Sequence, residues 1–319
     1  MILVISHPDD VHARRVIASL REGGHEAYLL DLSDLPDRAT LSMSFDDPLR
    51  PQLELRPEDG SPVDLGRVRT AWWRRPQAAN PADIADPHAR LFASSEWNEA
   101  INGLWLLLGG RWMNVPARDE RASRKAFQLR TAAEVGLRVP RTLMTSDPDR
   151  ARSFVESIGV GRAIFKTFAA TPVVWRETRI VREQELDALD AVRVAPVIFQ
   201  EFIEADADVR VTVVGERMFA MAIDASSTDY PVDFRMSLGQ ARTEVAELPG
   251  PVADALRALM DRLGLAYGAI DLRRTPSGEY VFLEVNPAGE FLFVEERTGL
   301  PITQALADWL AGAGVAAVS

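Results

Sequence analysis

Hydrophobic and polar residues alternate along this chain in patterns that predict short strands and amphipathic helices. The apolar run at residues 1–5 predicts a buried strand, residues 10–21 a helix with one apolar stripe, and residues 27–32 a second strand. This β-α-β order is typical of a small parallel α/β unit. Near the other end, residues 251–263 and 300–310 keep the apolar spacing of amphipathic helices.

The middle of the chain continues to alternate between the two element types. Residues 40–66 alternate weakly and predict two edge strands. Further strands are predicted at 69–73, 139–144, 162–168, 178–181, 197–199, 208–214 and 218–224, and helices at 94–108, 119–135, 148–157 and 183–191. We find no internal repeat, and the whole pattern is that of an α/β protein with several packed units.

Residues 266–293 carry the clearest polar and apolar alternation. It runs on both sides of the turn sequence at residues 275–278, Thr-Pro-Ser-Gly, which predicts a β-hairpin. If the two ends of that turn pair, Asp271 lies opposite Phe282. A bulge would shift this register.

Three polar residues of this hairpin share one strand face. Side chains repeat every second residue along a strand, so Asp271, Glu284 and Asn286 point to the same side. Carboxylate and amide oxygens are ligands that suit Mg2+, which is held by one or two carboxylates together with substrate phosphates. The alternative is an ordinary hairpin whose polar residues face water.

Composition narrows the class of protein. The chain has 319 residues, 47% hydrophobic and 26% charged, which is the composition of a globular protein. It has no cysteine, which excludes disulfides, thiolate catalysis and Cys-ligated zinc. The net charge of -11 argues against general nucleic-acid binding. No apolar run approaches the ~18 residues of a membrane span, so we expect a cytoplasmic enzyme or binding protein without a membrane partner.

Lysine is scarce in a chain rich in arginine. Of 36 basic residues only Lys125 and Lys166 are lysine, and the other 34 are arginine. Because arginine is a rigid planar fork and lysine a compact charge on a flexible stem, the two lysines mark positions where a fork does not fit. The alternative is two chance lysines on solvated faces.

Residues 6–10, Ser-His-Pro-Asp-Asp, follow the first predicted strand and resemble the zinc site of sugar-amide deacetylases. Such a site needs a third ligand, usually another histidine. The remaining histidines form no paired motif. We therefore interpret this segment as a loop in which Asp9 or Asp10 caps the first helix.

Several motifs, in this order, resemble the ATP-grasp ligases over nearly the whole chain. They are a helix lysine, a strand lysine before a small-residue loop at 169–172, the strand end Gln200-Glu201-Phe202-Ile203, the pair Asp208-x-Arg210, and Asp271 followed by Glu284-x-Asn286-Pro287. More narrowly, Asp10-x-His12-Ala13, Trp73-Arg74-Arg75-Pro76, Lys125-x-x-Gln128-Leu129, Val139-Pro140-x-Thr142 and Asn286-Pro287-x-Gly289 resemble the microviridin-type ligases. Those enzymes make graspetides, which are ribosomal peptides cyclised through side-chain esters or amides.

The resemblance implies an ATP-grasp fold in three parts. These are an N-terminal parallel α/β (pre-ATP-grasp) domain at residues 1–116, a central lid at 117–199, and a C-terminal α+β subdomain at 200–319 with the metal-binding hairpin. It also implies that ATP and Mg2+ are cofactors, and that the lid closes over the nucleotide.

The resemblance also assigns roles to residues of this sequence. Lys125 and Lys166 would contact the ATP phosphates, and Asp271, Glu284 and Asn286 would hold Mg2+. The remaining ATP residues would be Gln200, Glu201, Phe202, Ile203, Glu204 and Asp208, with main-chain groups of Glu201 and Ile203 at the adenine and Glu204 or Asp208 near the ribose. Arg210 and Arg235 would bind the γ-phosphate or the acyl phosphate.

A ribosomal precursor peptide, leader plus core, is the partner that the resemblance implies. Arg74 and Arg75 either line the cleft toward this substrate or pair with acids in the first unit, and Glu290 either contacts substrate or faces solvent. Relatives also lead us to expect a homodimer. Two other functions remain open: a ligase that adds a free amino acid to a peptide or protein, and a nucleotide-binding sensor or scaffold without activity.

Overall fold

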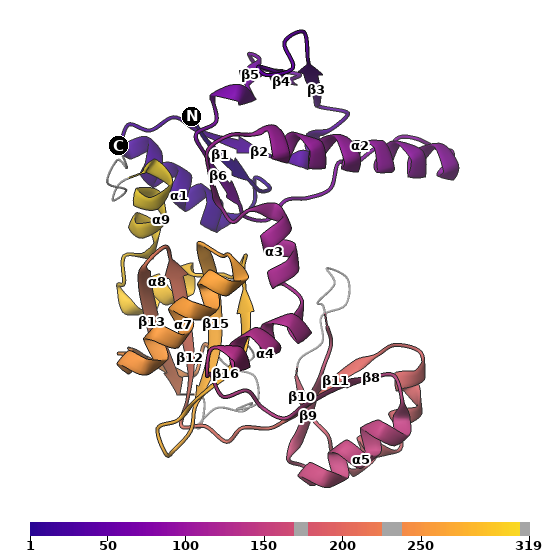
Figure 1. Cartoon of the computed structure of the whole chain (residues 1–319), viewed down its shortest axis with the longest axis vertical. Helices are drawn as coiled ribbons and strands as arrows, with labels where there is room; N and C mark the ends of the chain where they lie inside the picture. The colour runs from indigo at the N-terminus through magenta and orange to yellow at the C-terminus, as the bar shows by residue number, and fades with distance from the viewer. Residues whose placement is uncertain (169–177, 225–237, 313–319) are drawn as a thin grey trace.

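The computed structural model of the chain describes residues 1–168, 178–224 and 238–312, and in these residues the strands form four sheets. Figure 1 shows three packed units, the first at the top, the third below it on the left and the middle unit at the lower right. The fold is α/β, as predicted, and each unit has its own arrangement of strands.

The first unit is built on a parallel sheet. Its strands lie in the order β2 (Ala27–Leu30), β1 (Ile2–Ile5), β6 (Thr70–Trp73) and β7 (Arg111–Met113). All four residues of β1 are buried, because α1 (Val11–Glu22) packs on one face of the sheet and α2 (Pro87–Leu107) on the other. The β-α-β opening predicted from the apolar pattern is therefore confirmed.

The loop between β1 and α1 caps the helix. One carboxylate oxygen of Asp10, Oδ1, accepts from the backbone N–H of His12 at 3.0 Å and of Ala13 at 3.3 Å. This satisfies two of the amide groups that a helix leaves unpaired at its start. These two hydrogen bonds confirm that Asp10 caps the first helix.

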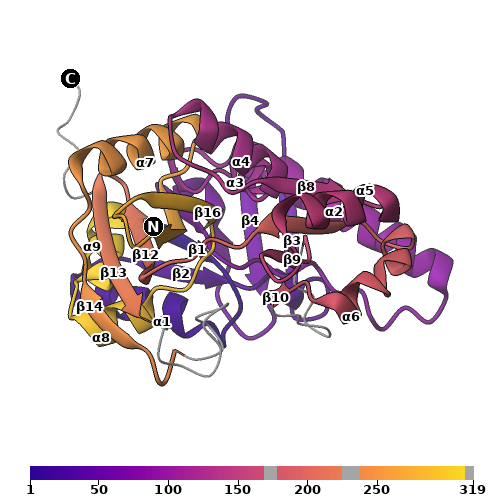
Figure 2. The same ribbon diagram turned by 90° about the horizontal axis from the view of Figure 1, so that it is seen from below.

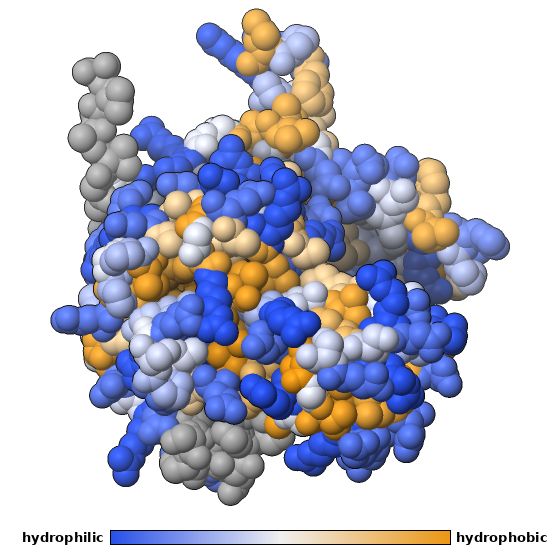
Figure 3. Space-filling view, turned by 60° about the horizontal axis from the view of Figure 1, so that its bottom comes forward, coloured by the Kyte–Doolittle hydropathy of each residue, from blue (hydrophilic) through white to orange (hydrophobic). Residues whose placement is uncertain are grey.

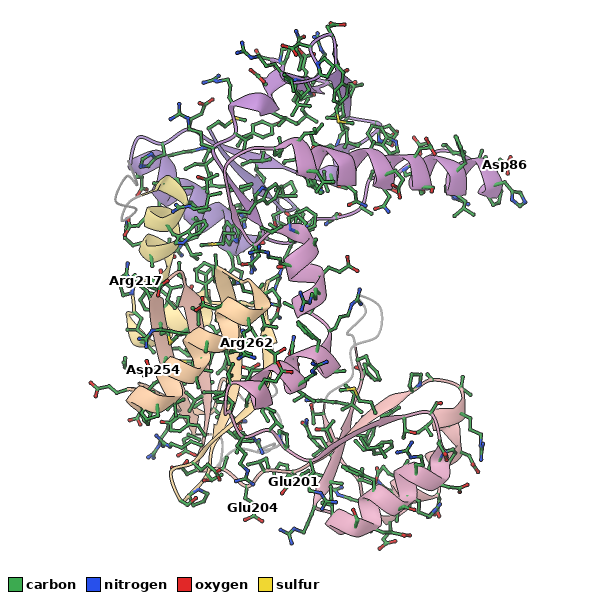
Figure 4. All side chains as sticks on the ribbon, in the orientation of Figure 1. Asp86, Glu201, Glu204, Arg217, Asp254 and Arg262 are labelled. Carbon is green, nitrogen blue, oxygen red and sulfur yellow. The ribbon has the colours of Figure 1, made fainter. Side chains whose placement is uncertain are left out.

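Helix α2 is longer than predicted and projects from its unit. It begins at Pro87 rather than residue 94, with Asp86 accepting from the N–H of His88 at 2.9 Å. Its N-terminal half is polar or exposed and gives no apolar stripe to predict from, and only Ile101, Leu104 and Trp105 are buried. Figure 4 labels Asp86 at the free end of the helix.

The region at 40–66 forms a small sheet of its own instead of two edge strands. Strands β3 (Ala39–Ser44), β4 (Gln52–Pro57) and β5 (Val63–Asp64) pair antiparallel in that order. Leu53 and Leu55 of β4 are buried and join the core under α2. The sheet therefore covers the first unit without extending its parallel sheet.

The single helix predicted at 119–135 is wrong, because the chain forms two helices there. These are α3 (Pro116–Ala122) and α4 (Lys125–Glu134), separated at Arg124, whose backbone is extended with φ -77 and ψ 107. Both helices pack against α7 (Gly250–Leu263), and α4 also packs against β16 (Tyr280–Asn286). They therefore belong to the third unit by contact, and Lys125 stands at the first position of a helix.

The middle unit is an antiparallel sheet covered by short helices. Its strands lie in the order β10 (Arg179–Ile180), β9 (Ala163–Lys166), β11 (Val197–Glu201) and β8 (Thr142–Thr145). They pack with α5 (Pro148–Ile158), α6 (Glu183–Leu186) and the 3-10 turn Leu189–Arg193. This compact body runs from 142 to 201, while the expected lid was 117–199; the closure of the lid stays a prediction.

The third unit carries an antiparallel sheet with α7 packed on one face. The order is β14 (Arg242–Val245), β13 (Arg217–Asp224), β12 (Ala207–Val214), β15 (Tyr267–Arg274) and β16. Figure 2 shows α7 along one side of this sheet, where its Leu256, Leu259 and Leu263 are buried. Val209 and Val211 face α7, so the residue between them, Arg210, points to the other face.

The chain ends by returning to the first unit. After β16 come α8 (Leu292–Thr298) and α9 (Ile302–Ala311), and α9 packs against α1 and β6. Residues of α1, α9 and β13 share one hydrophobic core, so the first and third units are joined as one body. No helix among the described residues is long and apolar enough to cross a membrane.

Candidate active site

The face of the third sheet opposite α7 brings together the residues predicted to hold metal. The β15–β16 register places Asp271 directly across from Glu284, and Ala269 across from Asn286. Asp271 and Glu284 have side chains that are 15% and 25% exposed, so both are reachable from solvent. We call Asp271, Glu284 and Asn286 the candidate metal edge.

A bulge in the hairpin produces this alignment. The predicted pairing of Asp271 with Phe282 is wrong, because Leu272 faces Phe282 and the register then shifts by one residue between Leu272 and Asp271. The turn is also one residue longer than predicted, with the N–H of Thr275 donating to the carbonyl of Glu279 at 2.8 Å. The shift brings the two carboxylates closer together than the regular register would.

Both carboxylates of the candidate metal edge contact a cation. Nη1 of Arg210 on β12 donates to Oδ1 of Asp271 at 2.7 Å, and Nζ of Lys125 forms an ion pair with Oε2 of Glu284. Burial alone would lower the pKa of Arg210, but the attraction of Asp271 and Glu284 outweighs it, so the pKa is raised and the charge is kept. The site therefore combines acids and fixed positive charge.

The buried side chain of Gln128 positions the helix that carries Lys125. The side-chain amide of Gln128 donates from Nε2 to the carbonyl of Val285 at 2.8 Å, and its Oε1 accepts from the N–H of Val285 at 3.1 Å. This pair of bonds fastens α4 to the strand that carries Glu284. Lys166 lies at the end of β9 in the middle unit, opposite Ile198, so the two lysines come from different units.

The segment predicted to hold adenine connects the middle and third units. Gln200 is buried and donates from Nε2 to Oγ1 of Thr142 at 2.9 Å, and the N–H of Glu201 donates to the carbonyl of Arg141 at 2.9 Å. Figure 4 places Glu201 and Glu204 at this connection, and Glu204 is exposed. Phe202 lies under the guanidinium of Arg273, 4.9 Å from the ring centroid.

Asp208, one of the two residues predicted near the ribose, is buried in an ion pair. Its Oδ1 accepts from Nε of Arg273 at 2.9 Å, and the two side chains are 9% and 7% exposed. Nη1 of the same arginine donates to the carbonyl of Ile203 at 2.7 Å. Asp208 thus helps to hold the connecting segment, and of the two residues predicted near the ribose Glu204 is the more accessible.

The turn after β16 is held by donors from two units. Arg74 of the first unit donates from Nη1 to the carbonyls of Ala288 at 2.6 Å and Gly289 at 2.8 Å. The hydroxyl of Tyr267 also donates to the Gly289 carbonyl, at 2.8 Å, and Nη2 of Arg210 donates to the carbonyl of Glu290 at 3.1 Å. Three successive carbonyls are therefore fixed.

The two arginines predicted to line the cleft have different surroundings. Arg74 is completely buried and its Nε donates to Oδ2 of Asp10 at 3.1 Å, while its Nη1 fixes the turn. Arg75 is partly exposed and forms an ion pair with Glu290 at 3.1 Å. The pairing with an acid of the first unit is confirmed for Arg74, while Arg75 and Glu290 stay predicted substrate residues.

Sequence reasoning missed one residue that joins the units. Asn114 is buried; its Oδ1 accepts from the N–H groups of Ala266 at 2.8 Å and Tyr267 at 2.9 Å, and its Nδ2 donates to the carbonyl of Tyr267 at 3.0 Å and to Asp119 at 3.2 Å. The sequence around it suggested only a connector. No local pattern distinguishes a connector asparagine that bonds a strand from one that faces water.

Two predicted features lie outside the described residues. These are Arg235, predicted to bind the γ-phosphate or acyl phosphate, and the small-residue loop at 169–172. The site described above consists of the candidate metal edge, Lys125, Lys166, Arg210 and the connecting segment 200–204.

Comparison with known proteins identifies the family. A family model for the RimK-like ATP-grasp domain matches residues 122–310, which include every element of this site from Lys125 to Asn286. The chain belongs to the RimK-like ATP-grasp family.

Solved structures extend the match of this ATP-grasp protein to nearly its full length. The macrocyclase MdnB from Microcystis aeruginosa is 32% identical, with a TM-score of 0.82 over 97% of this chain and 98% of MdnB. The ATP-grasp ligase PsnB, solved with minimal precursor, Mg and ADP, is 27% identical, with a TM-score of 0.80 over 98% of this chain and 96% of PsnB. The first unit therefore belongs to the shared fold as well.

A curated relative has a different description. A probable alpha-L-glutamate ligase from Shewanella loihica is 24% identical over 209 residues, which are 64% of this chain and 68% of that protein. This ATP-grasp protein is thus similar to MdnB and PsnB over more of its length, and at higher identity, than to that ligase.

Proposed function

We propose that this ATP-grasp ligase activates Asp or Glu side chains of a ribosomal precursor peptide and joins them to side-chain hydroxyls or amines, forming ester or amide crosslinks. The similarity to macrocyclases over 97% or more of the chain carries this proposal. The ligase releases ADP and phosphate, because a carboxylate is a poor acylating agent and must first be activated.

The residues of the candidate metal edge fit Mg2+. Two carboxylates and one amide oxygen lie on one face of the β15–β16 pair, and hard oxygen ligands of this kind, completed by substrate phosphates, are what Mg2+ prefers. Asp271, Glu284 and Asn286 would hold the metal, which when bound neutralises charge on the transferring phosphate. Lys125 lies beside Glu284, so a phosphate bound at this edge would meet a point charge as well.

The proposed reaction has two steps, formation of an acyl phosphate and its attack by a side-chain amine or hydroxyl. An oxygen of the peptide carboxylate forms a bond to the γ-phosphorus of ATP while the bond to the ADP oxygen breaks, which gives an acyl phosphate. A side-chain amine or hydroxyl then bonds to the acyl carbon, loses its proton, and phosphate leaves. No covalent enzyme intermediate is needed, in agreement with a chain that has no cysteine.

The protein's own groups bind, orient and exclude water. Arg210 keeps its charge beside Asp271, and we assign it to the γ-phosphate and the acyl phosphate, where a guanidinium binds two oxygens at once; Arg235 has the same proposed role. The Glu201 N–H and the Ile203 carbonyl have partners within the chain. The adenine edge is therefore assigned to the Glu201 carbonyl and the Ile203 N–H.

The middle unit would close over the nucleotide. It carries Lys166, whereas Lys125 lies on α4 against the third unit. ATP bound by both lysines would bridge the two bodies and exclude water from the acyl phosphate. Figure 3 shows exposed hydrophobic residues in a recess near the centre of one face, surrounded by hydrophilic ones.

The precursor peptide is the proposed partner, and a homodimer stays a prediction. We place the reaction in the cytoplasm, where ATP and a newly made peptide are both present.

The intact mass of the precursor peptide tests the proposal. The short peptide encoded beside this gene is incubated with the enzyme, ATP and Mg2+, and we expect the loss of one water for each crosslink. A gain in mass would instead indicate addition of a free amino acid, as in an amino-acid ligase. No change in mass despite nucleotide binding would refute ligase activity on this peptide and favour a sensor or scaffold.

A matched pair of variants isolates the metal edge. Glu284→Gln should abolish the mass change, because it removes one of the two carboxylates. Glu279→Gln changes an exposed glutamate of the same hairpin, paired with Arg138, and should leave the mass change intact.

A further inference from the structure

We propose that Arg74 of the first unit is a positioning residue for the metal ligand Asn286, acting through the backbone of Ala288. This inference rests on the proposed function. It assigns a role in metal binding to a domain that carries none of the metal ligands.

A continuous set of hydrogen bonds connects the two residues. Nη1 of Arg74 donates to the carbonyl of Ala288 at 2.6 Å, and the N–H of Ala288 donates to Oδ1 of Asn286 at 3.0 Å. Oδ1 is the oxygen that an asparagine offers to a cation, and it has a second lone pair. The guanidinium thus holds the residue that orients the ligand oxygen.

The turn has little freedom to move in any other direction. A Cβ built on Gly289 would lie 2.3 Å from Cβ of Ala269 and 3.0 Å from Nη2 of Arg210, so the glycine backbone is pressed against β15. Arg74 approaches the same turn from the first unit and binds its carbonyls. Packing on one side and hydrogen bonds on the other therefore fix where Asn286 points.

The position of Arg74 is itself firmly held. Its side chain is 0% exposed, its Nε donates to Oδ2 of Asp10, and the Oγ of Ser6 donates to the same oxygen at 2.9 Å. Asp10 also caps α1. The start of α1 thereby fixes the position of the Arg74 guanidinium relative to the turn at 288–289.

The variant Arg74→Lys tests whether Arg74 positions Asn286 or only holds the two units together. Arg74→Lys keeps a positive charge near Asp10, but a point charge cannot replace a fork that binds a carboxylate and two carbonyls at once. Loss of a residue that orients a metal ligand commonly lowers metal affinity by about 10- to 100-fold. We therefore expect the Arg74→Lys variant to require a Mg2+ concentration at least about tenfold higher than the parent does to reach the same affinity for ADP.

The measurement is the affinity for ADP by isothermal titration calorimetry, in EDTA and over a series of Mg2+ concentrations. In EDTA the variant should bind ADP as the parent does, because the nucleotide contacts are unchanged. The increase in ADP affinity that Mg2+ causes should appear in the variant only at Mg2+ concentrations higher than those the parent needs.

A second junction arginine provides the matched control. Arg111 of the first unit donates to the carbonyl of Trp309 on α9 and stacks on its ring at 3.9 Å. It joins the same two units, but β7 and α9 carry none of the predicted site residues. Arg111→Lys should lower thermal stability without shifting the Mg2+ series.

The outcomes are distinct. A Mg2+ series for Arg74→Lys that coincides with the parent overturns the inference and leaves the proposed function standing. A parent that gains no ADP affinity from Mg2+ overturns the metal edge, and the inference with it. If Arg74→Lys fails to fold, Asp10→Asn removes the acceptor of the Arg74 Nε, and a series unchanged from the parent then overturns the inference.

Discussion

Replacing Asp119 by asparagine should stabilise the protein at neutral pH and change how its stability depends on pH. Asp119 on α3 is 8% exposed, and its one side-chain partner is the amide of Asn114 at 3.2 Å. Burial raises the pKa of this carboxyl from 3.8 to about 6, although the hydrogen bond from Asn114 opposes the shift. The folded protein therefore holds this proton to a higher pH than the unfolded chain does.

The size of the effect follows from this difference. Two pKa units correspond to about 3 kcal/mol, and a raised carboxyl pKa makes the folded state less stable as pH rises from about 4 to 6. Above pH 6 the whole penalty is present. An asparagine side chain cannot ionise, so Asp119→Asn should gain up to about 3 kcal/mol at pH 7 and nothing at pH 4.

His12 has the opposite dependence in nearly the same pH range. Its ring is buried 4.8 Å from the Phe291 ring, and burial, with Arg74 nearby, lowers its pKa from 6.5 to about 4. Its contribution is complete above pH 6.5 and is lost as pH falls toward 4. In the parent the two groups offset each other, so Asp119→Asn should expose the acid sensitivity of His12.

Urea unfolding followed by tryptophan fluorescence, at half-unit steps from pH 4 to pH 7.5, measures the effect. The quantity compared is the difference in unfolding free energy between variant and parent at each pH, which removes the contribution of all other groups. Glu99→Gln, on the exposed side of α2, controls for the loss of one negative charge. A difference that stays constant over this range would refute the raised pKa of Asp119.

Three further substitutions test the site. Gly289→Ala forces a Cβ to 2.3 Å from that of Ala269, so the melting temperature should fall by the equivalent of about 1–3 kcal/mol; an unchanged value contradicts the close contact. Asp271→Asn removes the charge beside Arg210 and should reduce turnover by about 100-fold or more with the fold intact, and full activity would end the metal assignment. Lys166→Arg should weaken ADP binding about tenfold, or 1.4 kcal/mol, by calorimetry, whereas equal affinity would show that a fork fits there.

The sequence predicted those elements whose structure depends mainly on their own residues. The alternation at residues 266–293 predicted the hairpin, and the apolar run at 1–5 with the stripe after it predicted β1 and α1. These signals come from the periodicity of strands and helices, which each segment carries within itself. The ordered motifs then supplied the family.

Pairings between distant parts of the chain were not readable from sequence. Arg74 and the turn at 288–289 are separated by more than 200 residues, and no local pattern says which carbonyls a buried guanidinium will meet. The bulge between Asp271 and Leu272 was also missed, because its cause is the fit of the strand to its neighbours. The break between α3 and α4 at Arg124 was missed because the sequence on both sides of it favours helix equally well, so no local signal marks the break.

The shortage of lysine has a chemical consequence for an enzyme that makes acyl phosphates. Such intermediates acylate amines, whereas a guanidinium stays protonated and is no nucleophile in water. With 34 of 36 basic residues as arginine, the chain carries positive charge without offering amines that would be acylated in place of the peptide. Self-acylation of side-chain amines is thereby limited to Lys125 and Lys166, and a mass spectrum of the enzyme after turnover would show whether either lysine is acylated.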